Sequence, residues 1–119
     1  MDRDRCMVTN LHPRPGEASA YQRVDDADLN AAEDYVLIDR LPGIDGSGRI
    51  LILEGGSTAS NWAAADYLTR PATAKELLSH IKLPDGKLPA FFQVLLHVKY
   101  KDVVPTRTAF TIFRQIRQN

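Results

Sequence analysis

An uninterrupted aliphatic run, Ile-Leu-Ile-Leu at residues 50–53, constrains the fold of this chain more than any other feature. The run shows no alternation of apolar and polar residues and leads directly to Glu54 and a pair of glycines. Such a run is typical of a strand that is buried on both faces. We therefore expect residues 49–53 to form a central strand whose two faces are covered by other elements.

Segments on either side of this run predict three more strands. Residues 35–41 are rich in β-forming side chains, and the three glycines between residues 43 and 48 predict a turn that joins this segment to residues 49–53. Residues 92–100 and 108–116 alternate apolar and polar side chains, which predicts a long hairpin.

Two helices are predicted between these pairs of strands. The first covers residues 59–69 and ends before Pro71, because the residue that precedes a proline is pushed out of the α region. The second begins at Thr73, where Thr73 as N-cap and Glu76 at the third helical position have the spacing of a capping box.

The resulting order, β-β-α-α-β-β, predicts an α+β fold with a mixed four-stranded sheet and both helices on one face. A length of 119 residues suits one domain. We expect residues 1–30 to form an extended N-terminal arm or linker and residues 31–119 to form a single α+β domain. Residues 25–34 are acidic and rich in alanine, and predict a loop or a frayed helical turn.

Composition excludes several classes of protein. Fifteen basic residues balance fifteen acidic ones, so no bulk field would hold nucleic acid or an anionic membrane. Cys6 is the single cysteine, which excludes a disulfide framework within one chain. No apolar run is long enough to span a bilayer, and the charged start is unlike a secretory signal. We expect a soluble cytoplasmic protein that contacts neither nucleic acid nor membrane.

The balanced charge is unevenly distributed along the chain. Residues 25–54 hold eight acidic and two basic residues, whereas residues 80–119 hold seven basic and two acidic ones. We expect these opposite charges to form ion pairs within the chain rather than a head-to-tail interface between copies. The reason is that exposed charges usually form solvated faces and not interfaces.

The strongest candidate for a binding site is the start of the first helix. Here Gly55 and Gly56 would expose backbone N–H groups at the positive end of the helix dipole, and Ser57, Thr58 and Ser60 would add hydroxyl groups. This arrangement predicts a site for a small anionic ligand. The alternative is a glycine turn followed by an ordinary Ser/Thr N-cap.

Other reactive side chains form weaker patterns. His12, His80 and His97 are too widely spaced for a metal site, and Cys6 has no basic neighbour that would make it a nucleophile. No G-x-S-x-G motif is present for a hydrolase. The sequence therefore predicts no metal, no cofactor and no catalytic residue, and an enzyme is the less favoured class.

Acidic residues near the first hairpin supply the competing enzymatic hypothesis. Asp39, Asp45 and Glu54 could converge where this hairpin meets the start of the first helix. A small enzyme or nucleotide-binding half-domain would then use Asp39, Glu54 and Ser57 as reactive residues, and would act only as a homodimer.

Several segments together resemble a known group of proteins. They are residues 13–17 with Tyr21, residues 34–43, residues 48–58, and the short strings at 63–65, 68–69 and 88–89. The chain resembles the C-terminal region of uncharacterised bacterial proteins, many of which carry an N-terminal helix-turn-helix or winged-helix domain. The resemblance implies an upstream strand that this chain lacks, and hence an incomplete Rossmann-like α/β domain as an alternative fold.

The resemblance also shapes the functional expectation. It favours a non-enzymatic sensory or interaction domain related to transcriptional regulators. Such a domain would bind a small anionic ligand between Gly55 and Ser60, or self-associate through its sheet. The alternatives are the half-domain described above and a truncated gene fragment without autonomous function.

Overall fold

A computed structural model describes residues 7–116 of the chain. The elements are β1 (Met7–Thr9), β2 (Ala20–Gln22), β3 (Val24–Asp25), β4 (Ala31–Pro42), β5 (Arg49–Gly55), α1 (Thr58–Thr69), α2 (Pro71–Ile81), β6 (Phe92–Lys101) and β7 (Val104–Gln115). The predicted α+β class and the predicted order of β4, β5, α1, α2, β6 and β7 are confirmed. None of the described helices is long and apolar enough to cross a membrane.

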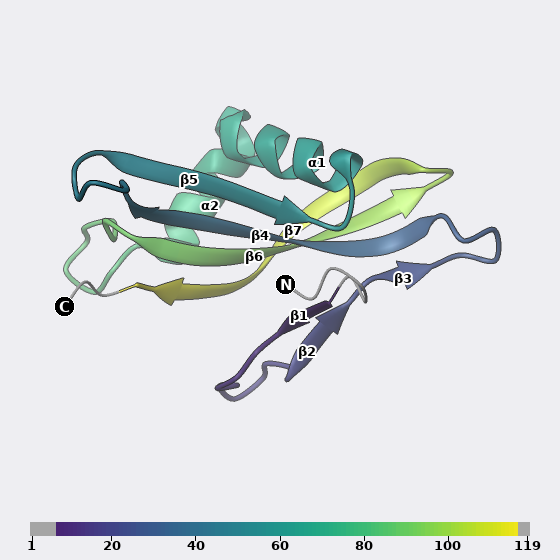
Figure 1. Cartoon of the computed structure of the whole chain (residues 1–119), viewed down its shortest axis with the longest axis horizontal. Helices are drawn as coiled ribbons and strands as arrows, with labels where there is room; N and C mark the ends of the chain where they lie inside the picture. Colours follow the sequence, from purple (N-terminus) through teal and green to yellow (C-terminus); the bar gives the residue numbers. More distant parts are fainter. Residues whose placement is uncertain (1–6, 117–119) are drawn as a thin grey trace.

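The main sheet has five strands rather than the expected four: the strand order is β5-β4-β6-β7, and β3 pairs with the start of β4. We expected a mixed sheet, but every pairing between the described strands is antiparallel. The reason is that the two helices carry the chain across β4, so that β5 and β6 flank β4 without touching each other (Figure 1). A Rossmann-like arrangement is therefore excluded for residues 7–116, because such a fold requires parallel neighbours.

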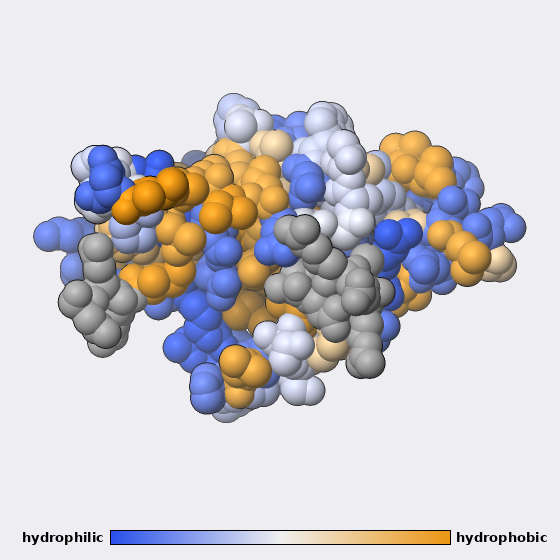
Figure 2. Space-filling view, viewed as in Figure 1, coloured by the Kyte–Doolittle hydropathy of each residue, from blue (hydrophilic) through white to orange (hydrophobic). Residues whose placement is uncertain are grey.

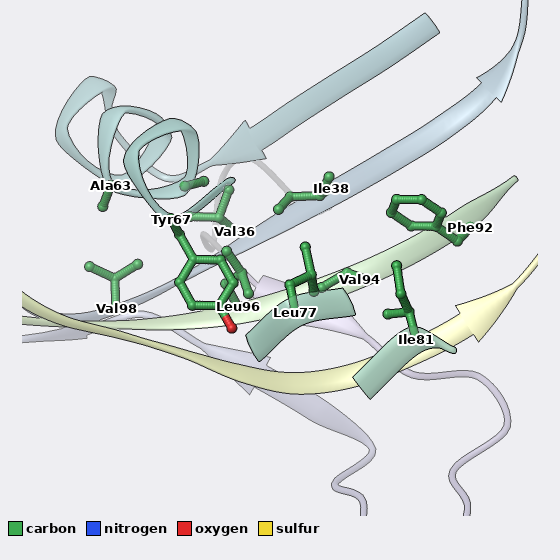
Figure 3. Close-up of a cluster of buried hydrophobic side chains, with 11 residues drawn as sticks. Val36, Ile38, Ala63, Tyr67, Leu77, Ile81, Phe92, Val94, Leu96 and Val98 are labelled. Carbon is green, nitrogen blue, oxygen red and sulfur yellow. The ribbon is translucent and has the colours of Figure 1, made fainter. Parts of the chain in front are cut away.

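The core lies between the helices and one face of the sheet. Alternate residues of β4 point to this face, and Val36 and Ile38 are completely buried there. Residues of β6 and of both helices complete the cluster (Figure 3), which consists of Val36, Ile38, Ala63, Ala64, Tyr67, Leu77, Ile81, Phe92, Val94, Leu96 and Val98.

The aliphatic strand β5 is the main correction to the expected fold. It lies at the edge of the sheet, and the side chains of Leu51 and Ile52 are 54% and 40% exposed. Only Leu53 in the run packs against the core. The central positions belong to β4 and β6, because the helical crossover returns the chain to the far side of β4. An aliphatic run thus indicated a strand but not its place in the sheet.

The helix boundaries correct the predicted capping box. α1 starts at Thr58 with Ser57 as its N-cap, whereas α2 starts at Pro71, a residue well suited to the first helical position. Thr73 therefore lies inside α2, and its hydroxyl donates to the Tyr67 carbonyl oxygen at 2.7 Å.

The N-terminal segment lies on the face of the sheet opposite the helices (Figure 1). Glu17 accepts hydrogen bonds from Arg114 of β7, and the ring of Tyr21 meets that of Tyr35 edge-on with centroids 5.3 Å apart. Residues 25–34, expected as a loop or helical turn, instead contain the end of β3, a turn and the start of β4. Pairing across β4 stabilises extended backbone that local composition did not indicate.

Candidate functional site

A buried carboxylate occupies the start of α1. Asp34 of β4 is 1% exposed, and its Oδ2 accepts hydrogen bonds from the Gly56 N–H at 3.1 Å and the Ser60 hydroxyl at 2.5 Å. Its Oδ1 accepts from the Tyr35 N–H at 2.9 Å. The anion at this helix N-terminus is therefore a side chain of the protein itself.

Hydroxyl groups extend this network to a third element. The Ser60 hydroxyl also contacts the hydroxyl of Tyr100 on β6. Ser57 caps α1 by accepting from the Ser60 N–H at 3.2 Å, and its hydroxyl donates to Ser60 Oγ at 3.1 Å. The network joins β4, α1 and β6, and so fixes the point where β5 leads into the helix.

The two glycines are explained by the close approach of these groups. A Cβ atom added to Gly56 would lie 2.8 and 2.9 Å from the carboxylate oxygens of Asp34. A Cβ atom added to Gly55 would lie 2.9 Å from Asn61 Oδ1 and 3.1 Å from Val36 Cγ2. Both positions therefore exclude larger residues because of internal packing.

The structure brings the predicted site residues Gly55, Gly56, Ser57, Thr58 and Ser60 together at the start of α1. The Gly56 N–H and the Ser60 hydroxyl bind the Asp34 carboxylate, and Thr58 is exposed.

Our sequence reasoning missed Asp34 as a member of this network. The spacing along the strand could have revealed it. Asp34 lies two residues before Val36 and four before Ile38, so its side chain points to the same buried face of β4.

Only two of the three acidic residues of the enzymatic hypothesis, Asp39 and Glu54, lie close together. Asp39 and Glu54 lie on the sheet face opposite the helices, where burial and then the charge of Glu54 raise the pKa of Asp39, against a hydrogen bond from Gln93. Asp45 lies in the β4–β5 turn, at the other end of β5 from Ser57, and accepts from the Ser47 N–H at 3.0 Å. Asp45 and Ser57 therefore do not share a reactive centre with Asp39 and Glu54.

The three histidines lie on separate segments: His12 between β1 and β2, His80 on α2 and His97 on β6. His97 stacks on Tyr35 with centroids 4.8 Å apart, and its Nε2 lies 3.0 Å from Glu33 Oε1, an ion pair when the imidazole is protonated. His80 stacks on Phe110 with centroids 4.2 Å apart. Within residues 7–116 no three His, Cys, Asp or Glu side chains gather as metal ligands, and Cys6 lies outside the described residues.

A cavity of about 300 Å³ lies between α1 and the start of β7. Trp62 lines it and is 63% exposed, while Asp66 and Arg70 form an ion pair with each other at 3.0 Å. Tyr67 also lines it but is 1% exposed, and burial, followed by the charge of Glu76, raises its pKa to about 12. Asp66 and Arg70 therefore neutralise each other, the exposed Arg107 also lines the cavity, and Tyr67 stays protonated.

The outer edge of β5 is the other candidate site. The Gly43 N–H donates to the Gly48 carbonyl oxygen at 3.3 Å, and the Ile116 N–H to the Phe91 carbonyl oxygen at 3.0 Å. Hydrogen-bonded and non-bonded pairs alternate along antiparallel strands. From either of these bonds, the alternation can be followed residue by residue through the strand registers to β5. The backbone N–H and C=O groups of its even-numbered residues then face β4. Those of Arg49, Leu51, Leu53 and Gly55 point outward.

This edge is apolar as well as open. No described strand pairs with the outer side of β5, and hydrophobic side chains gather over it (Figure 2). Leu51 and Ile52 project from opposite faces of the strand because side chains alternate. An exposed, long and aliphatic edge is a template for pairing with another strand.

Comparison with known proteins adds no relative. No protein-family model matches the chain, and no curated protein or solved structure matches it.

Proposed function

We propose that this protein is a non-enzymatic cytoplasmic interaction domain that binds an extended partner segment as an additional strand beside β5. The observation that carries the proposal is the open edge of β5, with four outward-facing backbone positions and exposed aliphatic side chains on both faces. In strand addition, main-chain hydrogen bonds supply affinity and alternate side chains supply specificity.

The state of the helix start supports an interaction domain over a small-ligand sensor. The Gly56 N–H and the Ser60 hydroxyl, which would bind an external anion, are engaged by Asp34. An external anion would have to displace a buried carboxylate and leave it without partners, which is costly. The network instead stabilises the junction between β5 and α1.

The resemblance to C-terminal regions of bacterial regulatory proteins is consistent with this role. Domains attached to DNA-binding modules commonly act through contacts with other chains, which an open strand edge provides. The separation of Asp39 and Glu54 from Ser57 on opposite faces of the sheet gives the half-domain enzyme hypothesis no comparable support.

The proposal can be tested with an array of random nonapeptides probed with the labelled full chain. We expect binding to peptides that alternate aliphatic residues, and loss of binding in Leu51→Pro. Leu51 points its N–H outward, so proline at this position removes a donor for the partner and spares the bonds to β4.

The matched control is Thr106→Lys on the opposite edge strand, β7, which should leave peptide binding unchanged. Equal binding of the peptides by wild type and Leu51→Pro would contradict the proposal. So would an array to which the folded wild-type chain binds no extended peptide.

A further inference from the structure

We propose that the partner bound at β5 is a second copy of this chain, paired antiparallel about a two-fold axis that passes through Leu51. The inference rests on the proposed function and names the partner of the same edge. It joins two five-stranded sheets, each with the order β5-β4-β6-β7 and with β3 beside the start of β4, into one continuous sheet across a β5–β5 seam.

Symmetry limits how two copies of β5 can pair. Only a two-fold axis perpendicular to the sheet makes the strand its own antiparallel neighbour, and this axis keeps each side chain on its original face. Odd-numbered residues therefore pair with odd-numbered ones. Arg49, Leu51 and Leu53 already direct their backbone groups outward, so one strand supplies both donors and acceptors for the other.

Side-chain chemistry selects the register. With the axis at Leu51, the two Leu51 side chains face each other, and Ile50 faces the partner's Ile52 on the other side of the sheet. With the axis at Ile52, Ile50 would instead face the partner's Glu54. Directly opposed apolar pairs stabilise a sheet, so the first register is favoured.

The same pairing accounts for the composition of β5. An aliphatic run without alternation is typical of strands buried on both faces, a position that β5 reaches only when another strand covers its edge.

The register also adds apolar area beyond the strands. It carries the partner's 43–48 turn alongside residues 54–59, and the tip residue Ile44 is 99% exposed. A stable dimer buries roughly 800 Å² on each partner, more than one short strand provides, so this contribution from the turn matters.

The first test is sedimentation equilibrium of the full chain from low micromolar to near-millimolar concentration. We expect a monomer–dimer equilibrium that Leu51→Lys weakens roughly a hundredfold, because the axis places the two lysines directly opposite each other. Thr106→Lys on the β7 edge should not change it. Leu51 is 54% exposed, so matching circular dichroism spectra and melting curves of the dilute variants will show that the monomers stay folded.

A chain that stays monomeric at every concentration, or a dimer that Leu51→Lys leaves intact, would overturn this inference. The proposed function would still stand if extended peptides bind the wild type and not Leu51→Pro. If the peptides also bind both proteins equally, both proposals fail.

The second test fixes the register by disulfide formation in a Cys6→Ser background. The hydrogen-bonded pair at Leu51 places its Cα atoms about 5.5 Å apart, which a disulfide can span. Leu51→Cys should therefore cross-link under mild oxidation, while Ile44→Cys, the most exposed control, should not. Faster cross-linking of Ile52→Cys than of Leu51→Cys would overturn the axis at Leu51.

Discussion

The two long edges of the sheet differ in every property that controls strand pairing. β7 contains Pro105, the exposed Arg107 and the partly buried Arg114, and its register against β6 shifts at two places. Proline, charge and irregular register are the means by which natural sheets prevent edge-to-edge association. β5 pairs with β4 without a shift, and Leu51 and Ile52 are exposed near its centre. One edge is thus protected, and the other is suited to a partner.

The edges also differ in how they are held. The end of β5 is fixed from inside the protein, where Gly56 and Ser60 bind Asp34. The face of β7 is joined to the N-terminal segment by the pair of Arg114 with Glu17. A firmly held but open edge can accept a strand without first becoming ordered, which lowers the entropic cost of binding.

The largest expected change in stability distinguishes the residues of β5 whose N–H groups face β4 from those whose N–H groups point outward. Ile52→Pro should destabilise the protein by more than about 3 kcal/mol, since it removes an N–H that faces β4, whereas Leu51→Pro should cost far less. Urea unfolding of both variants measures the difference. Equal losses would show that the outward-facing residues have been assigned incorrectly.

The next effect concerns the anchor of β5. Asp34→Ala should cost about 3 kcal/mol, because it leaves the Gly56 N–H and the Ser60 hydroxyl buried without their acceptor. Loss of the helix cap in Ser57→Ala should cost about 1 kcal/mol. Thermal and urea unfolding compare the two variants, and a smaller loss for Asp34→Ala would contradict the anchoring role.

Acid should weaken the contact between Glu17 and Arg114, which joins the N-terminal segment to β7. Hydrogen bonds from Arg114 and then from the Arg14 backbone lower the pKa of Glu17 from 4.5 to about 2. Glu17 therefore stabilises the folded state above pH 4.5, and this contribution is lost as the pH falls from 4.5 toward 2. Urea unfolding across this range should show a decline that is shallower in Glu17→Gln. Identical profiles would mean that this contact does not stabilise the fold.

The smallest change in stability is expected when a side chain on the open edge of β5 is shortened in the monomer. Leu51→Ala should change the free energy of unfolding of the dilute monomer by less than about 1 kcal/mol, since its side chain is 54% exposed. Phe113→Ala on β7 should cost about 2 kcal/mol, because Phe113 packs against the core. A large loss in monomeric Leu51→Ala would show that Leu51 serves the monomer rather than a partner.

Much of the local structure could be predicted from the sequence. The alternation of residues 92–100, the glycines of residues 43–48 and the proline at residue 71 correctly indicated β6, the β4–β5 turn and the boundary between the helices. These features act over a few residues, and their physical causes are local: side-chain alternation, backbone freedom and a missing N–H.

The candidate site could be predicted only in part. Gly56, Ser57 and Ser60 were singled out because a helix start attracts an anion, and an anion is bound there. That this anion is Asp34 depends on β4 passing beneath α1, a contact between residues far apart in the chain. No local pattern distinguishes an internal carboxylate from an external ligand.

The sequence by itself determined the class of the fold, the order of the elements from β4 to β7 and the aliphatic character of β5. The tertiary structure alone decided that β5 lies at an edge, that every described pairing is antiparallel, and that Asp34 fills the start of α1. The physical reason is that hydrophobicity specifies how much surface a strand should bury, whereas the path of the chain across β4 specifies which neighbour can bury it.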